Sequence, residues 1–155
     1  MGEGFKMSVE RVIDAPPETV WRVWTGRTEE WFCPKPWTIE LIAQELRPGG
    51  RSALVIKGPN GERMPQEGVF LEVERPRRIV TTDAFAAGWV PRPAFMVAVT
   101  EFEDLGDGRT RYRATARHWT EEAMAQHREM GFEQGWSIVA EQLAALAEEE
   151  ARAAG

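Results

Sequence analysis

The sequence predicts an α+β domain in which a curved antiparallel sheet wraps around one long C-terminal helix. Most of the chain consists of short segments that alternate in polarity or are rich in β-branched residues, with tight turns between them. The last part instead shows helical periodicity over about 30 residues without a turn signal. With a length of 155 residues, these patterns fit a single domain over residues 1–155, and we expect its ends, 1–4 and 153–155, to fray.

The N-terminal part predicts a strand followed by two short helices. Residues 5–14 alternate in polarity, which is typical of a strand with one buried face. Pro16 and Pro17 suit the first turn of a helix, because the missing N–H of proline has no partner to lose there. A second short helix is expected over residues 28–32.

The middle of the chain predicts an antiparallel meander. Extended segments are expected at residues 38–47, 51–57, 64–74, 78–85, 95–103 and 110–119. Pro-Gly-Gly, Pro-Asn-Gly and Gly-Asp-Gly sequences separate several of them, and glycine supplies the positive φ that such turns require. Consecutive strands joined by tight turns pair with their neighbours in the chain, so we expect a sheet with one covered face and one wet face.

The C-terminal segment predicts one continuous helix from Thr120, as its N-cap, to about residue 150. An apolar stripe at helical spacing is formed by Phe132, Trp136, Val139, Leu143 and Leu146. Gly131 and Gly135 lie inside this helix, where glycine costs about 1 kcal/mol relative to alanine, so we expect them to make room for another backbone or for a ligand. Since one helix cannot fill the concave face of so many strands, we expect an internal cavity between helix and sheet.

Composition and charge exclude several classes of function. The formal net charge of −6 at pH 7 argues against nucleic acid and against an anionic membrane surface as partners. Apolar runs fall far short of the ~20 residues that a membrane-spanning helix needs. The first residues do not resemble a secretory signal, and the single cysteine, Cys33, fits a reducing compartment. We therefore expect a cytoplasmic protein.

Metal and cofactor sites are not expected. His118, His127 and Cys33 are the candidate ligands, but no two of them have the short spacing that zinc sites commonly use. No glycine-rich loop opens a helix in the way that a phosphate-binding loop does.

Several short motifs, taken in order, resemble the START-like helix-grip superfamily and, within it, the branch of activator of heat-shock-protein-90 ATPase homologues. The motifs are residues 14–21, 31–34, 46–51, 68–73 and 75–80, together with Gly135, Trp136, Leu143 and Leu146. The resemblance implies a helix-grip fold. It also implies one of the functions found in the superfamily, which are the binding of lipids or other small hydrophobic compounds, cyclase or aromatase activity, and co-chaperone action. The eukaryotic co-chaperone has a further N-terminal domain, so a chaperone partner is not implied.

The leading hypothesis is that the cavity binds a small apolar or amphipathic molecule, because aromatic residues from separate segments converge on it in this fold. The expected lining residues are Trp31, Trp37, Met64, Phe70, Phe85, Trp89, Phe95, Tyr112, Met124, His127 and Phe132. The segment 86–94, which carries Trp89, is either a lid over the mouth of the pocket or a contact between two copies of the chain.

Two further hypotheses stay open at this point. A cyclase or aromatase would use the same cavity with Asp83 or His118 handling a proton. Against this, His118 can simply bond a loop carbonyl and Asp83 can lie on the wet face of its strand. An interaction protein would instead have a filled core and an exposed apolar patch.

Overall fold

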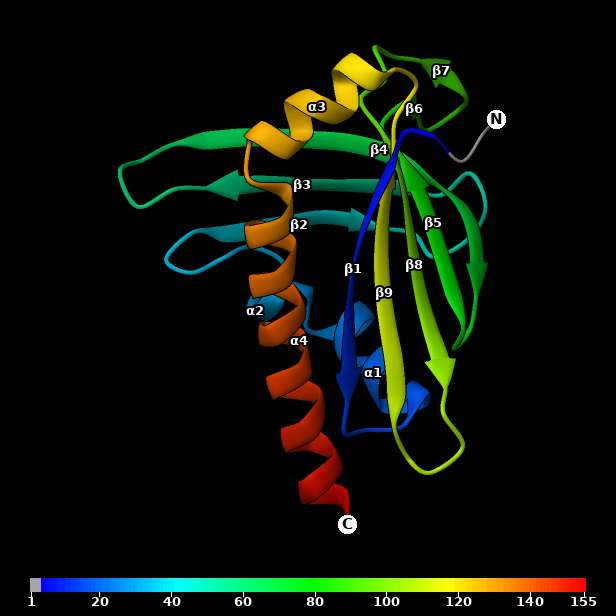
Figure 1. The fold of residues 1–155 in the computed structure, drawn as a ribbon. Coiled ribbons are helices and arrows are strands. Elements are labelled where there is room, and N and C mark those ends of the chain that lie inside the picture. Colours follow the sequence, from blue (N-terminus) through cyan, green and yellow to red (C-terminus); the bar gives the residue numbers. More distant parts are fainter. Residues whose placement is uncertain (1–3) are drawn as a thin grey trace.

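The structure, a computed structural model, describes residues 4–155 and confirms the α+β class. The elements are β1 (Lys6–Ile13), α1 (Pro17–Gly26), α2 (Thr28–Trp31), β2 (Thr38–Gln44), β3 (Arg51–Lys57), β4 (Arg63–Glu74), β5 (Arg78–Thr82), β6 (Phe85–Ala86), β7 (Val90–Pro91), β8 (Val97–Asp104), β9 (Thr110–Arg117), α3 (Glu121–Glu129) and α4 (Phe132–Ala154). The main sheet curves around α4, as Figure 1 shows. Residues 1–3 of the expected N-terminal fray lie outside the described residues, and α4 continues through Ala154.

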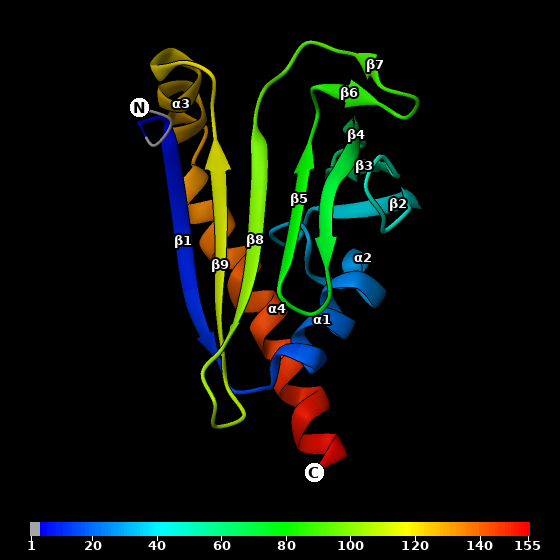
Figure 2. The same cartoon turned by 90° about the vertical axis from the view of Figure 1, so that its right-hand side faces the viewer.

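The main sheet has seven strands in the order β1-β9-β8-β5-β4-β3-β2, and every pairing in it is antiparallel. The predicted meander accounts for the order from β2 to β9, while β1 joins at the far edge by pairing with β9 from Lys6↔Arg117 to Ile13↔Thr110. The segment between β5 and β8 leaves this sheet and forms the separate two-stranded hairpin β6–β7. This hairpin and α3 lie at the same end of the molecule, as Figures 1 and 2 show.

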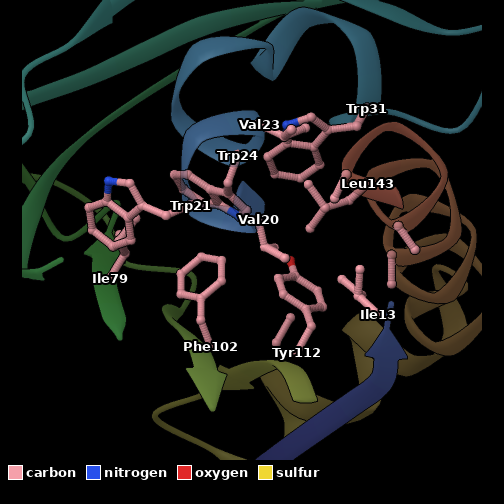
Figure 3. Packing of buried hydrophobic residues seen from close by; sticks show 14 of the residues in the cluster. Ile13, Val20, Trp21, Val23, Trp24, Trp31, Ile79, Phe102, Tyr112 and Leu143 are labelled. Carbon is pink, nitrogen blue, oxygen red and sulfur yellow. The ribbon is translucent and has the colours of Figure 1, made fainter. Parts of the chain in front are cut away.

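The hydrophobic core fills the concave side of the sheet near α1. Trp21 and Trp24 pack edge-on against Phe102 of β8, with ring centroids 5.6 and 6.4 Å apart, and Trp24 lies 5.3 Å from Trp31 of α2. Figure 3 shows these rings gathered between α1, the sheet and α4. Leu143 completes the contact from the α4 side and is fully buried.

The prediction of one continuous C-terminal helix is wrong, because the helix breaks at Gly131. This glycine has a left-handed φ of 91°, so α3 ends before it and α4 starts in a new direction. The predicted N-cap is confirmed, since the Thr120 side chain accepts a hydrogen bond from the backbone N of Ala123 at 3.0 Å. No atom lies within 4 Å of where a Cβ would stand at Gly131 or Gly135, so neither glycine serves the close backbone approach we expected.

None of the helices in residues 4–155 combines the length and the apolar character needed to cross a lipid bilayer.

Candidate functional site

Two histidines meet at the end of the molecule where α3 crosses the sheet. His118 directly follows β9 and has the same strand parity as the buried residues Tyr112, Ala114 and Ala116, so its side chain turns to the concave side. His127 comes from the last turn of α3. Each histidine is only 7% exposed, so both imidazoles of the pair are buried.

A chain of hydrogen bonds determines which ring nitrogens of the two histidines carry a proton. The Nδ1 of His118 lies 3.0 Å from the carbonyl oxygen of Phe95, and its Nε2 lies 3.0 Å from the Nδ1 of His127. A carbonyl can only accept, so the Nδ1 of His118 carries a proton. In the neutral pair the Nε2 of His118 must then accept from the Nδ1–H of His127, which leaves a lone pair on the Nε2 of His127.

That last nitrogen has no hydrogen-bond partner among residues 4–155. It is also not among the fully buried side-chain nitrogens of residues 4–155 that lack a hydrogen-bond partner, which belong to Arg11, Trp24, Trp31 and Arg78. The Nε2 of His127 therefore remains in contact with space that a water or a ligand atom can enter.

Aromatic rings form the walls around the pair. His127 meets Phe95, Phe132 and Trp136 edge-on, with ring centroids 4.9, 5.1 and 5.7 Å away, and Phe95 also lies 5.1 Å from His118. Burial among these rings, together with a smaller electrostatic effect of His118, lowers the pKa of His127 from 6.5 to about 4. The imidazole of His127 is therefore neutral at physiological pH and can accept a hydrogen bond.

Asp83 holds the same wall in place from the other side. Its carboxylate accepts hydrogen bonds from the backbone N–H groups of Phe95 and Met96, at 2.8 and 3.2 Å. Thr82 adds a bond from its hydroxyl to the carbonyl of Met96 at 2.9 Å. Asp83 thus fixes the backbone N of Phe95 while His118 fixes its carbonyl, so both candidate proton handlers position one loop residue.

The remaining predicted lining residues divide into two groups. Trp31, Phe70 and Tyr112 belong to the buried cluster on the concave side, and so does Phe132, which also contacts His127. Burial raises the pKa of Tyr112 to about 12. Side chains fill the concave face beside α1, so the expectation of a cavity is confined to the end beside α3.

The second group lies toward the surface. Trp37, Phe85, Phe95 and Met124 are half-buried, and Met64 and Trp89 are exposed.

Trp89 stands at the tip of the β6–β7 hairpin in a strained conformation. Its φ is 61°, in a region that side-chain-bearing residues rarely adopt. Its ring meets Phe85 edge-on at 5.7 Å and covers Gly49, where a Cβ would stand only 3.0 Å from the indole. Arg92 ties the base of the hairpin to β4 through a 2.8 Å hydrogen bond to the carbonyl of Glu67. The hairpin is therefore docked on the sheet by specific contacts, even though its tip is exposed.

Sequence reasoning placed Trp136 in the apolar stripe of the helix but not in this site. The residues 127, 132 and 136 do not share one face of a continuous helix. They come together only because the break at Gly131 turns α3 back over the start of α4.

Two hollows open elsewhere on the molecule. One, of about 520 Å³, lies between Pro17, the turn at Pro76 and the residues around Phe102, and the other, of about 270 Å³, lies among Glu101, Glu103, Arg111 and Arg113. Arginine–glutamate pairs largely neutralise these surfaces, such as Arg111 with Glu103 at 3.1 Å. Neither hollow coincides with the histidine pair.

No group of three or more His, Cys, Asp or Glu side chains that could hold a metal ion occurs in residues 4–155. The thiol of Cys33 is half-buried, and burial raises its pKa to about 11, so it is not an activated nucleophile.

Comparison with known proteins gives a family and a set of similar structures. The family model described as "Activator of Hsp90 ATPase homolog 1-like protein" matches residues 14–148. The crystal structure of a Nitrosomonas europaea protein is 37% identical, with 94% of this chain and 96% of that chain covered and a TM-score of 0.88. The solution structure of an Arthrobacter aurescens protein is 26% identical, with coverage of 96% and 89% and a TM-score of 0.81.

The crystal structure of a Silicibacter pomeroyi protein described as AHSA1 is 19% identical, with coverage of 94% and 99% and a TM-score of 0.71, and shows the shared fold. No curated protein matches the chain.

Proposed function

The chain belongs to the family of activator of Hsp90 ATPase homologue 1-like proteins, and on that premise we propose that it binds a small apolar or amphipathic molecule at the end of the concave face beside α3. The observation that carries the proposal is the buried His118–His127 pair within walls of aromatic rings. Ligand sites of this kind are mostly apolar and carry a few polar groups that orient the bound molecule.

The energetics of the pair support a binding role. An apolar core has no need of two imidazoles, because each buried polar atom requires a partner to offset its lost hydration. Here three ring nitrogens are accounted for by each other and by Phe95, and the fourth is left available. In the core near α1 the nitrogens without a hydrogen-bond partner, those of Trp24 and Trp31, are instead fully buried donors.

We assign three further predicted lining residues to the entrance of this site. Half-buried Phe85 and Met124 come from the hairpin segment and from α3, and exposed Met64 lies on β4. The docked β6–β7 hairpin is the segment that we interpret as a lid.

The test is a fluorescence titration with N-phenyl-1-naphthylamine, an uncharged apolar dye that brightens in apolar surroundings. We expect Phe95→Ala to weaken binding by roughly tenfold, because it removes one aromatic wall worth about 1–2 kcal/mol of apolar contact. The substitution leaves the backbone bonds of residue 95 to Asp83 and His118 in place.

The matched control is Val12→Ala, which trims an exposed β1 side chain opposite Arg111, far from α3. Unchanged dye affinity in Phe95→Ala, or an equal loss in Val12→Ala, would contradict the assignment. Native mass spectrometry of freshly purified protein adds a direct search for a co-purifying molecule.

A second candidate function is docking of a protein partner, including a second copy of the chain, at the same end. Its supporting observation is a group of exposed apolar side chains on the hairpin and around α3, namely Trp89, Val90, Trp119 and Met130. Light scattering during size-exclusion chromatography tests self-association. A dimer that Trp89→Ala converts to a monomer supports this candidate, and a wild-type monomer at all concentrations removes self-association.

A further inference from the structure

The chemistry of the available ring nitrogen restricts the class of ligand. We propose that the molecule bound at this site is a neutral aromatic compound that donates a hydrogen bond, typically from a phenolic hydroxyl, to the Nε2 of His127. This inference rests on the proposed function and narrows it from an apolar ligand to a hydrogen-bond donor.

The hydrogen bonds of the pair run in one direction. The carbonyl of Phe95 forces a proton onto the Nδ1 of His118, and this in turn forces a proton onto the Nδ1 of His127 in the neutral pair. The polar atom that the pair offers outward is consequently an acceptor. The carbonyl that starts this order is itself held in place, because Asp83 fixes the N–H of the same residue.

Charge also restricts the class of ligand. The groups in ring contact with His127 are Phe95, His118, Phe132 and Trp136, none of which carries a fixed positive charge. An acceptor lone pair repels a carboxylate, and among residues 4–155 none of the rings in contact with His127 supplies a cation to compensate. On the surface of α3, the exposed Glu121 and Glu122 of the first turn are offset by Arg128 in the last turn, so these surface charges do not decide between ligands. A neutral ligand is therefore favoured.

The shape of the aromatic walls restricts the ligand further. Aromatic rings prefer edge-to-face or offset contacts with one another, and the walls present rings at interplanar angles between 62° and 75° to His127. A flat aromatic body extends this arrangement and brings a ring hydroxyl to the imidazole edge. An aliphatic chain would gain the apolar contact but not these ring geometries.

The test compares three probes of one skeleton by isothermal titration calorimetry at neutral pH. 2-Naphthol is a neutral donor, 2-methoxynaphthalene has no donor, and 2-naphthoate is an anion. We expect 2-naphthol to bind about five- to tenfold more tightly than 2-methoxynaphthalene, as one hydrogen bond to an accessible nitrogen provides, and 2-naphthoate to bind most weakly.

Two variants assign the preference to His127. His127→Phe keeps an aromatic ring but removes the acceptor, so the two neutral probes should bind equally, and this comparison also corrects for the extra methyl group of the ether. His127→Leu, which also lacks an acceptor, serves if the phenylalanine variant does not fold. Val12→Ala is the control and should keep the wild-type ratio.

The outcomes separate the two proposals. Equal binding of 2-naphthol and 2-methoxynaphthalene to the wild type, or tightest binding of 2-naphthoate, overturns the donor inference and leaves the binding function standing. If the wild type binds neither these probes nor the apolar dye, the binding function itself fails.

An independent readout is the tautomer of His127 in long-range proton–nitrogen NMR spectra. We expect an unprotonated Nε2, whose resonance shifts when 2-naphthol is added. A protonated Nε2 at neutral pH overturns the inference.

Discussion

The two ends of the concave face are built from the same kind of residue but behave differently. Beside α1, the rings of Trp21, Trp24, Phe102 and Tyr112 pack against one another and close the interior. Beside α3, rings of the same types surround two imidazoles instead. Figure 3 shows the first arrangement.

This difference in packing assigns stability to the end beside α1 and the proposed binding function to the end beside α3. The end beside α1 gains free energy from every ring that it buries. The end beside α3 gives up part of that gain, because its imidazoles lose hydration and need exact partners. The strained Trp89 and the left-handed Gly131 occur at this same end, which fits the general tendency of strained backbone to gather near functional sites.

The largest loss of stability is expected in the tightly packed core beside α1. Phe102→Ala should lower the free energy of unfolding by about 3–5 kcal/mol, because it leaves a cavity among Trp21, Trp24 and Tyr112. Urea unfolding followed by circular dichroism measures this. Phe95→Ala, at the half-buried end, should cost about 1–2 kcal/mol. Similar losses in both variants would mean that the two ends do not differ in packing.

The second prediction uses the titration of His127. Its pKa is about 4 in the folded protein and 6.5 ordinarily, so between these values the unfolded chain binds a proton that the folded chain does not. Stability therefore rises with pH across this window and is lost as pH falls through it. We expect this histidine to account for about 1–3 kcal/mol of the loss between pH 6.5 and 4.

The measurement is urea unfolding at a series of pH values, and the comparison is His127→Gln. Carboxylates titrate equally in both proteins, so the difference between the two curves isolates the histidine. Curves that stay parallel through the window would show that the imidazole is not buried as described.

The smallest effects on the free energy of unfolding, of opposite sign, are expected at Gly131 and Gly135. Gly131→Ala should cost about 1–2 kcal/mol, because alanine is strained at a φ of 91°. Gly135→Ala should add about 0.5–1 kcal/mol, since this position is helical and nothing lies within 4 Å of the new methyl group. Thermal unfolding measures both. If both substitutions changed the stability in the same direction, the helix would not be broken at Gly131 alone.

The break between α3 and α4 limits how much of the site can be predicted from the sequence. The two-residue period of a strand puts His118 on the same face as Tyr112, but it does not tell which face of the sheet is concave. His127 is among the expected lining residues, but a continuous helix gives no reason to bring it to His118. Its contact with His118 depends on the bend at residue 131, for which glycine alone is only a weak signal.

The sequence by itself determined the α+β class, the order of the strands from β2 to β9, the N-cap at Thr120 and the family, because turn residues, polarity periods and short motifs are local properties. Only the tertiary structure decided that Asp83 and His118 act on the two sides of one residue, Phe95, and that His118 meets His127. The physical reason is that these contacts join segments from different parts of the chain, so their distances and hydrogen-bond directions are set by how the sheet curves and where the helix bends.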